Sequence, residues 1–114
     1  ENHGGIVAEA ESLLEIVRTT RSEWVGINLD TGNFHTDDVY ADIARCVPHA
    51  VNVQLKVQIQ PRGAKKKSAA DVDRLVKILR DGGYQGFVAL EYEATANPWD
   101  AVPKWLDKLK EAIG

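Results

Sequence analysis

Hydrophobic and polar residues recur along the chain with two periods, one typical of helices and one typical of strands. Apolar residues spaced i, i+3, i+4 and i+7 lie on one face of a helix. Four segments show this spacing and predict amphipathic helices over residues 10–17, 40–47, 72–79 and 102–109. We expect Pro48 to end the second helix. We also expect a capping box at residues 68–71 (SAAD) to begin the third helix, and Gly82 and Gly83 to end it.

Three segments between these helices are predicted to be strands. Residues 24–30 (WVGINLD) and 86–92 (GFVALEY) are short and apolar, and residues 51–59 alternate strictly between apolar and polar. Strands that alternate with helices indicate βαβ units and a parallel sheet, which is the α/β fold class. No linker or shift in composition divides the chain, so we expect one domain over residues 1–114.

The period of two also predicts which side chains share a face of the sheet. In the middle strand Val53 and Leu55 face one side, whereas Gln54 and Lys56 face the other. The same test places Asp30 and Glu91, which end the first and last strands, on the polar side with Gln54 and Lys56. Polar side chains at the carboxyl ends of parallel strands are typical of (β/α)₈ barrels, where active sites occupy that end. A piece of such a barrel fits better than a doubly wound domain, since no glycine-rich phosphate loop is present.

The composition of the chain limits which classes of partner we expect and indicates that the chain is part of a longer protein. A net charge of −3 gives no reason to expect a nucleic-acid partner, and no apolar run approaches the ~20 residues of a membrane helix. The single cysteine, Cys46, excludes an internal disulfide and suits a cytoplasmic protein. Because the chain lacks methionine, we expect it to be a fragment of a longer protein. We expect this fragment on its own to self-associate, most readily as a dimer, because its outer strands present unpaired backbone groups.

Three acidic residues carry the candidate chemistry. Asp30 and Glu91 face the same side, and Glu1 opens the chain. Buried carboxylates need a hydrogen-bonded partner, a counter-ion or a metal. Oxygen ligands suit Mg²⁺ or Mn²⁺, and a mixed nitrogen and oxygen set also suits Zn²⁺ or Co²⁺. The alternative is that Asp30 and Glu91 cap turns or pair with Lys56, and the residues alone leave both interpretations open.

Three motifs together resemble a known family. Residues 1–5 (ENHGG), 29–34 (LDTGNF) and 83–93 (GYQGFVALEYE) are similar to successive signatures of the sugar phosphate isomerase/epimerase family, within the xylose-isomerase-like TIM barrel superfamily. The resemblance spans the chain. It implies the C-terminal half of a TIM barrel, from the end of strand five through helix eight.

The resemblance also implies a metal site and a reaction. It implies a divalent metal (Mn, Mg, Zn or Co), and the residues that match its ligands are Glu1, Asp30, Gln54 and Glu91. Gln54 stands where the family has a histidine, which weakens the expected affinity. In such enzymes two glutamates, here Glu1 and Glu91, act as acid and base on a sugar or sugar phosphate through an enediolate.

The same resemblance places three further residues at the substrate: Asn33, His35 and Lys56. The alternative function is a non-catalytic carbohydrate-binding barrel that has lost the metal-ligand histidine. Residues 62–67 (RGAKKK) follow the middle strand, where many barrels bind phosphate, although lysine runs are more often solvated loops.

Overall fold

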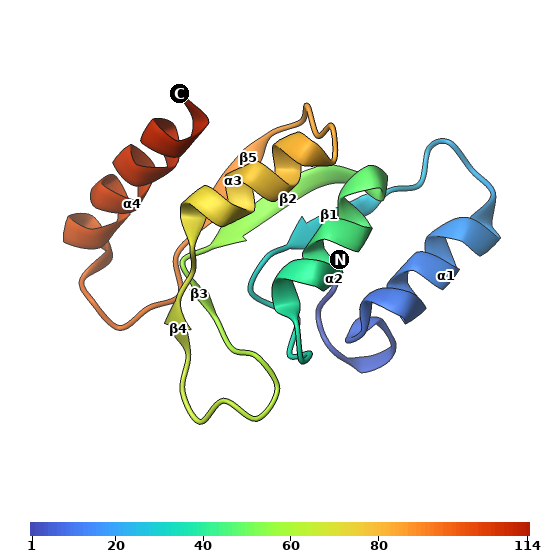
Figure 1. Ribbon diagram of the computed structural model, residues 1–114, viewed down its shortest axis with the longest axis horizontal. Helices are drawn as coiled ribbons and strands as arrows, with labels where there is room; N and C mark the ends of the chain where they lie inside the picture. The colour runs from blue at the N-terminus through green and yellow to red at the C-terminus, as the bar shows by residue number, and fades with distance from the viewer.

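Three parallel strands form the central sheet. The computed structural model describes residues 1–114 (Figure 1). Strand β2 (Ala50–Lys56) lies between β1 (Ile27–Asp30) and β5 (Val88–Glu91) and pairs in parallel with both. The predicted parallel α/β arrangement is therefore confirmed, with β1 beginning later than residue 24 and β5 later than residue 86.

Four helices stand in a row over one face of this sheet (Figure 1). They are α1 (Ala10–Thr20), α2 (Val39–Cys46), α3 (Val72–Asp81) and α4 (Pro98–Ile113), with the short 3₁₀ turns η1 (Gly5–Val7) and η2 (Val47–His49). Each helix packs against the next, α1 on α2, α2 on α3 and α3 on α4. No helix has the length and apolarity needed to cross a membrane.

The hydrophobic core fills the layer between the helices and the sheet. Leu29, Val53 and Leu55 have no exposed surface, and the apolar stripe of α3 is buried with them. Gln54, between Val53 and Leu55 on β2, is only partly buried, and Ala89 of β5 is exposed. The two faces predicted from the period of two are therefore those of the folded sheet, and the polar face carries no helices.

The segment after β2 differs from the prediction. The expected strand over residues 51–59 breaks at Val57, and β3 (Gln58–Ile59) turns away to pair antiparallel with β4 (Ser68–Ala69). The expected capping box at residues 68–71 is wrong, because Ser68 belongs to β4. Asp71 caps α3 instead, accepting a 3.0 Å hydrogen bond from the N–H of Arg74. The β3–β4 hairpin projects beyond the sheet as a long loop (Figure 1).

Candidate functional site

The ammonium group of Lys56 lies among three carboxylates at the carboxyl ends of the parallel strands. Lys56 ends β2, and the strand register places it beside Glu91. Its Nζ lies 3.1 Å from Asp30 Oδ2, 3.6 Å from Glu91 Oε1 and 3.1 Å from Glu93 Oε2. It also donates a 2.8 Å hydrogen bond to Asn33 Oδ1. We call Asp30, Asn33, Lys56, Glu91 and Glu93 the Lys56 cluster.

The chain after β1 is shaped to admit the lysine side chain. A Cβ at Gly32 would lie 2.6 Å from both Cβ and Cδ of Lys56, so a larger residue there would collide with the lysine stem. Thr31 Oγ1 accepts a 3.0 Å hydrogen bond from the N–H of Lys56, and Asp30 Oδ1 accepts one of 2.8 Å from the N–H of Gly32. The side chains of Lys56 and Asp30 are 7% and 0% exposed. Their ion pair is therefore buried and held by the backbone on both sides.

Burial and neighbouring charges shift two pKa values in the cluster. Burial raises the pKa of Glu91 and the charge of Asp30 raises it further, while Lys56 acts in the opposite direction. Burial by itself would lower the pKa of Lys56, but hydrogen bonds to Asp30 and Glu93 outweigh it and raise the pKa. Glu91 Oε2 is buried without a hydrogen-bond partner. The two oxygens of Glu91 therefore differ: Oε1 lies near the ammonium, and Oε2 is enclosed by the protein.

A row of amide groups continues the site along the polar face. The amide nitrogen of Asn28 donates to Glu1 Oε2 at 3.1 Å and to Gln54 Oε1 at 2.7 Å. Asn28 Oδ1 accepts a 2.8 Å hydrogen bond from Asn52 Nδ2. Glu1 and Gln54 are thus joined through one amide rather than directly. The row leads to the Lys56 cluster through Asn33, whose Nδ2 lies 2.9 Å from Asp30 Oδ2 and 3.5 Å from Glu1 Oε1.

Asn2 ties the first residues of the chain to β1. Its amide donates a 2.8 Å hydrogen bond to the Asp30 carbonyl, and its Oδ1 accepts one of 2.9 Å from the Asp30 N–H. The side chain has no exposed surface. This double contact imitates a step of strand pairing. It places Glu1 next to Asn28 even though residues 1–3 form no regular element.

A pocket of about 530 Å³ opens beside the cluster and shares Asn33 with it. Its other polar side chains are those of His3, Glu9, His35 and Arg62. The volume lies within the ~300–1,000 Å³ of typical small-molecule sites. The pocket and the cluster together form the candidate site.

The seven residues singled out from the sequence lie at one end of the sheet. Asp30, Asn33, Lys56 and Glu91 meet in the cluster, Glu1 and Gln54 meet at Asn28, and His35 lines the pocket. Their catalytic, substrate-binding and ligand roles stay predictions. Sequence reasoning gives no role to Asn2, Asn28 or Glu93. For Asn28 and Glu93 a signal exists, since each lies two residues from a predicted site residue and so shares its face, whereas nothing in the pattern marks Asn2.

The four residues expected to hold a metal offer only oxygen atoms. Carboxylate and amide oxygens suit a hard cation such as Mg²⁺ or Mn²⁺, and Glu91 Oε2 is a buried oxygen without a partner. The donor chemistry therefore fits such an ion. The side chains do not gather around one point, however: no group of three or more His, Cys, Asp or Glu residues is placed to hold a metal. Lys56 supplies the positive charge between Asp30 and Glu91.

The fold is of the α/β class: a parallel sheet covered by helices on one face, with polar side chains at the carboxyl ends of its strands, which is consistent with part of a (β/α)₈ barrel. The family model described as xylose isomerase-like TIM barrel matches residues 1–109. The chain therefore belongs to the xylose isomerase-like TIM barrel family. A search of curated proteins gives no match to it.

Proposed function

We propose that the chain is the C-terminal half of a (β/α)₈ barrel, from the end of its fifth strand through its eighth helix. In a barrel every strand has a neighbour on each side. Here β1 and β5 each pair on one side only, while the helices cover a single face of the sheet. Both features support a partial barrel that further strands complete.

We propose that this half-barrel carries catalytic residues of a sugar or sugar-phosphate isomerase or epimerase. The observation that carries the proposal is the environment of Glu91, whose Oε1 lies 3.6 Å from Lys56 Nζ while its buried Oε2 has no partner. The Glu91 side chain is 32% exposed and its pKa is raised, so this carboxylate is suited to accept a proton from a carbon next to a carbonyl. The C–H electron pair then forms the carbon–carbon double bond of an enediolate, and the carbonyl oxygen takes the negative charge.

Other residues of the chain complete the reaction. Glu1, on the far side of the amide row, is the second acid–base group. It returns a proton to the neighbouring carbon in an isomerisation, or to the opposite face of the same carbon in an epimerisation. Lys56 donates hydrogen bonds to substrate oxygens, and Asn33 and His35 orient the sugar. Glu1, Asp30, Gln54 and Glu91 offer the oxygen atoms for a divalent cation, but their side chains would first have to converge on one point, which they do not do in this structure. When bound, the cation would stabilise negative charge on the substrate oxygens.

A non-catalytic carbohydrate-binding barrel is the second candidate. The observation that favours it is the buried Lys56–Asp30 ion pair, which neutralises the acidic side chains without a metal. The Gln54 side chain, moreover, is already hydrogen-bonded to Asn28. In this function the amides and carboxylates would bind sugar hydroxyl groups without moving a proton.

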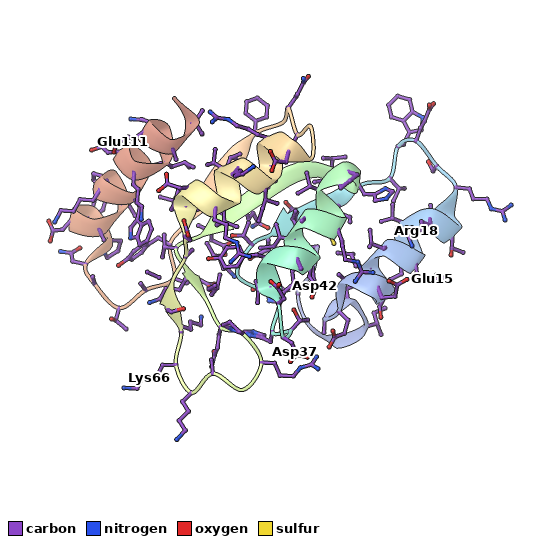
Figure 2. The ribbon with its side chains drawn as sticks, in the orientation of Figure 1. Glu15, Arg18, Asp37, Asp42, Lys66 and Glu111 are labelled. Atoms are coloured by element: carbon purple, nitrogen blue, oxygen red, sulfur yellow. The ribbon has the colours of Figure 1, made fainter.

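Proton exchange with solvent separates the two functions. The intact protein is incubated in D₂O with free ketopentoses, ketohexoses and their phosphates, with and without Mg²⁺ or Mn²⁺, and deuterium next to the carbonyl is followed by NMR. An isomerase incorporates deuterium, and Glu91→Gln lowers the rate by roughly 10²-fold or more, as expected for loss of a general base. Glu111→Gln is the matched control, because Glu111 lies exposed on α4 away from the cluster (Figure 2). Sugar binding without exchange would establish the binding function and overturn the enzymatic one.

A further inference from the structure

The ammonium group of Lys56 lies between two of the carboxylates that are expected to bind a metal. Its Nζ lies 3.1 Å from Asp30 Oδ2 and 3.6 Å from Glu91 Oε1. The three side chains come from β1, β2 and β5, which pair with one another. Further strands of a barrel would pair at the outer edges of β1 and β5. The contacts of the ammonium therefore lie within the part of the sheet that this chain forms by itself.

The expected ligands already use their oxygen atoms inside the protein. Asp30 has no exposed surface, and its Oδ1 accepts a 2.8 Å hydrogen bond from the N–H of Gly32, while its Oδ2 accepts one of 2.9 Å from Asn33 Nδ2. Gln54 Oε1, the atom that stands in place of a histidine nitrogen, accepts a 2.7 Å hydrogen bond from Asn28 Nδ2. A divalent ion would have to break these hydrogen bonds and displace the ammonium, because two cations so close repel each other.

The lysine is fixed in this position from its backbone to its end. Its N–H donates a 3.0 Å hydrogen bond to Thr31 Oγ1, and its Nζ donates one of 2.8 Å to Asn33 Oδ1. The stem passes over Gly32, where a Cβ would lie 2.6 Å from both Cβ and Cδ of the lysine. The side chain is only 7% exposed. Movement of the lysine to make room for a metal would therefore break a buried ion pair, which is strongly unfavourable.

We propose that the Lys56 ammonium takes the place of the divalent metal in this chain, so that the site excludes the metal and stabilises negative charge on the substrate without it. The catalytic part of this inference rests on the proposed isomerase function. When Glu91 removes the proton next to the carbonyl, the carbonyl oxygen takes the negative charge and accepts a hydrogen bond from Lys56 Nζ. The ammonium keeps its protons in this step. Glu93, whose side chain is 49% exposed, is the contact that the substrate oxygen replaces.

Titration with Mn²⁺ tests the exclusion of the metal without any substrate. We expect the intact wild-type protein to bind Mn²⁺ no more tightly than about 1 mM in calorimetry, and Lys56→Met to bind it roughly tenfold or more tightly. The variant frees oxygen atoms of Asp30 and Glu91, and methionine adds no oxygen ligand of its own. Lys66→Met is the matched control, because Lys66 is exposed at the end of the β3–β4 hairpin (Figure 2), and it leaves the affinity unchanged.

Two results of this titration would overturn the inference. One is stoichiometric binding of Mn²⁺ by the wild-type protein at micromolar concentration, and the other is no gain in affinity in a folded Lys56→Met variant. Circular dichroism checks that the variant is folded, and if it is not, the titration of the wild-type protein decides alone.

Turnover tests the catalytic part. The exchange experiment in D₂O is repeated with the wild-type protein in excess EDTA and with added Mn²⁺, and we expect equal rates. Exchange that stops in EDTA and returns with Mn²⁺ overturns the inference but leaves the isomerase proposal standing. If no sugar exchanges under either condition, the isomerase proposal fails together with the catalytic part, and the Mn²⁺ titration still decides whether Lys56 excludes the metal.

Discussion

Replacement of Lys56 by methionine tests whether its ammonium group holds the carboxyl ends of the strands together. Methionine keeps much of the apolar stem that passes Gly32 but removes the charge. The variant leaves Asp30, which has no exposed surface, without its cationic partner. It also leaves Glu91 and Glu93 without the ammonium between them. We expect the free energy of unfolding to fall.

The size of this loss depends on the hydrogen bonds and solvent contact that each carboxylate keeps in the variant. Removal of one member of a buried ion pair costs ~3–5 kcal/mol. Asp30 still accepts hydrogen bonds from the Gly32 N–H and from Asn33 Nδ2. The side chains of Glu91 and Glu93 are 32% and 49% exposed, so water screens part of their repulsion. These contacts place the loss near the low end, at about 3 kcal/mol at pH 7.

The loss should depend on pH in a defined direction. The pKa of Glu91 is already raised, so its stabilising contribution is present at acidic pH and is lost as the pH rises through the folded-state value. Without Lys56 this pKa rises further, and protonation at acidic pH removes the repulsion. The pKa of Lys56 is also raised, so the wild-type protein loses the contribution of the ammonium only as the pH rises through that alkaline value. The destabilisation by Lys56→Met therefore shrinks between pH 7 and pH 5.

Urea denaturation of the intact protein, followed by tryptophan fluorescence at both pH values, measures the effect. Lys66→Met is the matched control, because Lys66 is exposed at the end of the hairpin, and its effect should stay within ~0.5 kcal/mol. A loss below ~1 kcal/mol for Lys56→Met, or an equal loss at both pH values, would refute the assignment of Lys56 as the counter-ion.

Three further predictions follow from the same contacts. Glu91→Gln should raise the free energy of unfolding at pH 7 while it removes turnover, because the raised pKa marks a carboxylate disfavoured in the folded state; lower stability in denaturation would contradict this. Gln54→His should raise affinity for Zn²⁺ or Co²⁺ in calorimetric titration by adding an imidazole beside carboxylates, and no gain would remove Gln54 from the ligand position. The 114-residue chain alone should self-associate in sedimentation at micromolar concentration, because β1 and β5 have open edges and Trp24 and Phe87 are 88% and 87% exposed; a monomer with cooperative unfolding would favour a self-contained domain.

The larger elements of the fold could be predicted because each has a clear period. The apolar stripe of α3 and the alternation of β2 specify both the type of element and the face that it buries. The β3–β4 hairpin could not be predicted in the same way, since two-residue strands have no measurable period. Ser68 fits a capping pattern, but its backbone pairs with Ile59, and Asp71 is left to cap the helix.

The sequence predicts that residues of the candidate site share one face of the sheet, but it does not predict how they contact one another. The period of two places Asp30, Lys56 and Glu91 on one face. Whether the acids surround a metal cation or the Lys56 ammonium depends on where the lysine side chain lies. The lysine can lie there only because residue 32 is glycine, since a Cβ at that position would collide with the lysine stem. The contact of Asn2 with Asp30 joins residues 28 positions apart, so no local pattern could indicate it.

One irregularity in the sheet aligns the polar side chains of the site. Ile27 pairs with Ala50, whereas Asn28 pairs with Asn52, so the register shifts by one residue at Val51. Without this shift Asn28 would lie opposite Val51, and Asp30 opposite Val53, which faces the helices. A one-residue slip moves a strand's side chains to the wrong face. Because the shift brings Asp30 beside Gln54, the amide row and the Lys56 cluster both depend on the same register as the hydrophobic core.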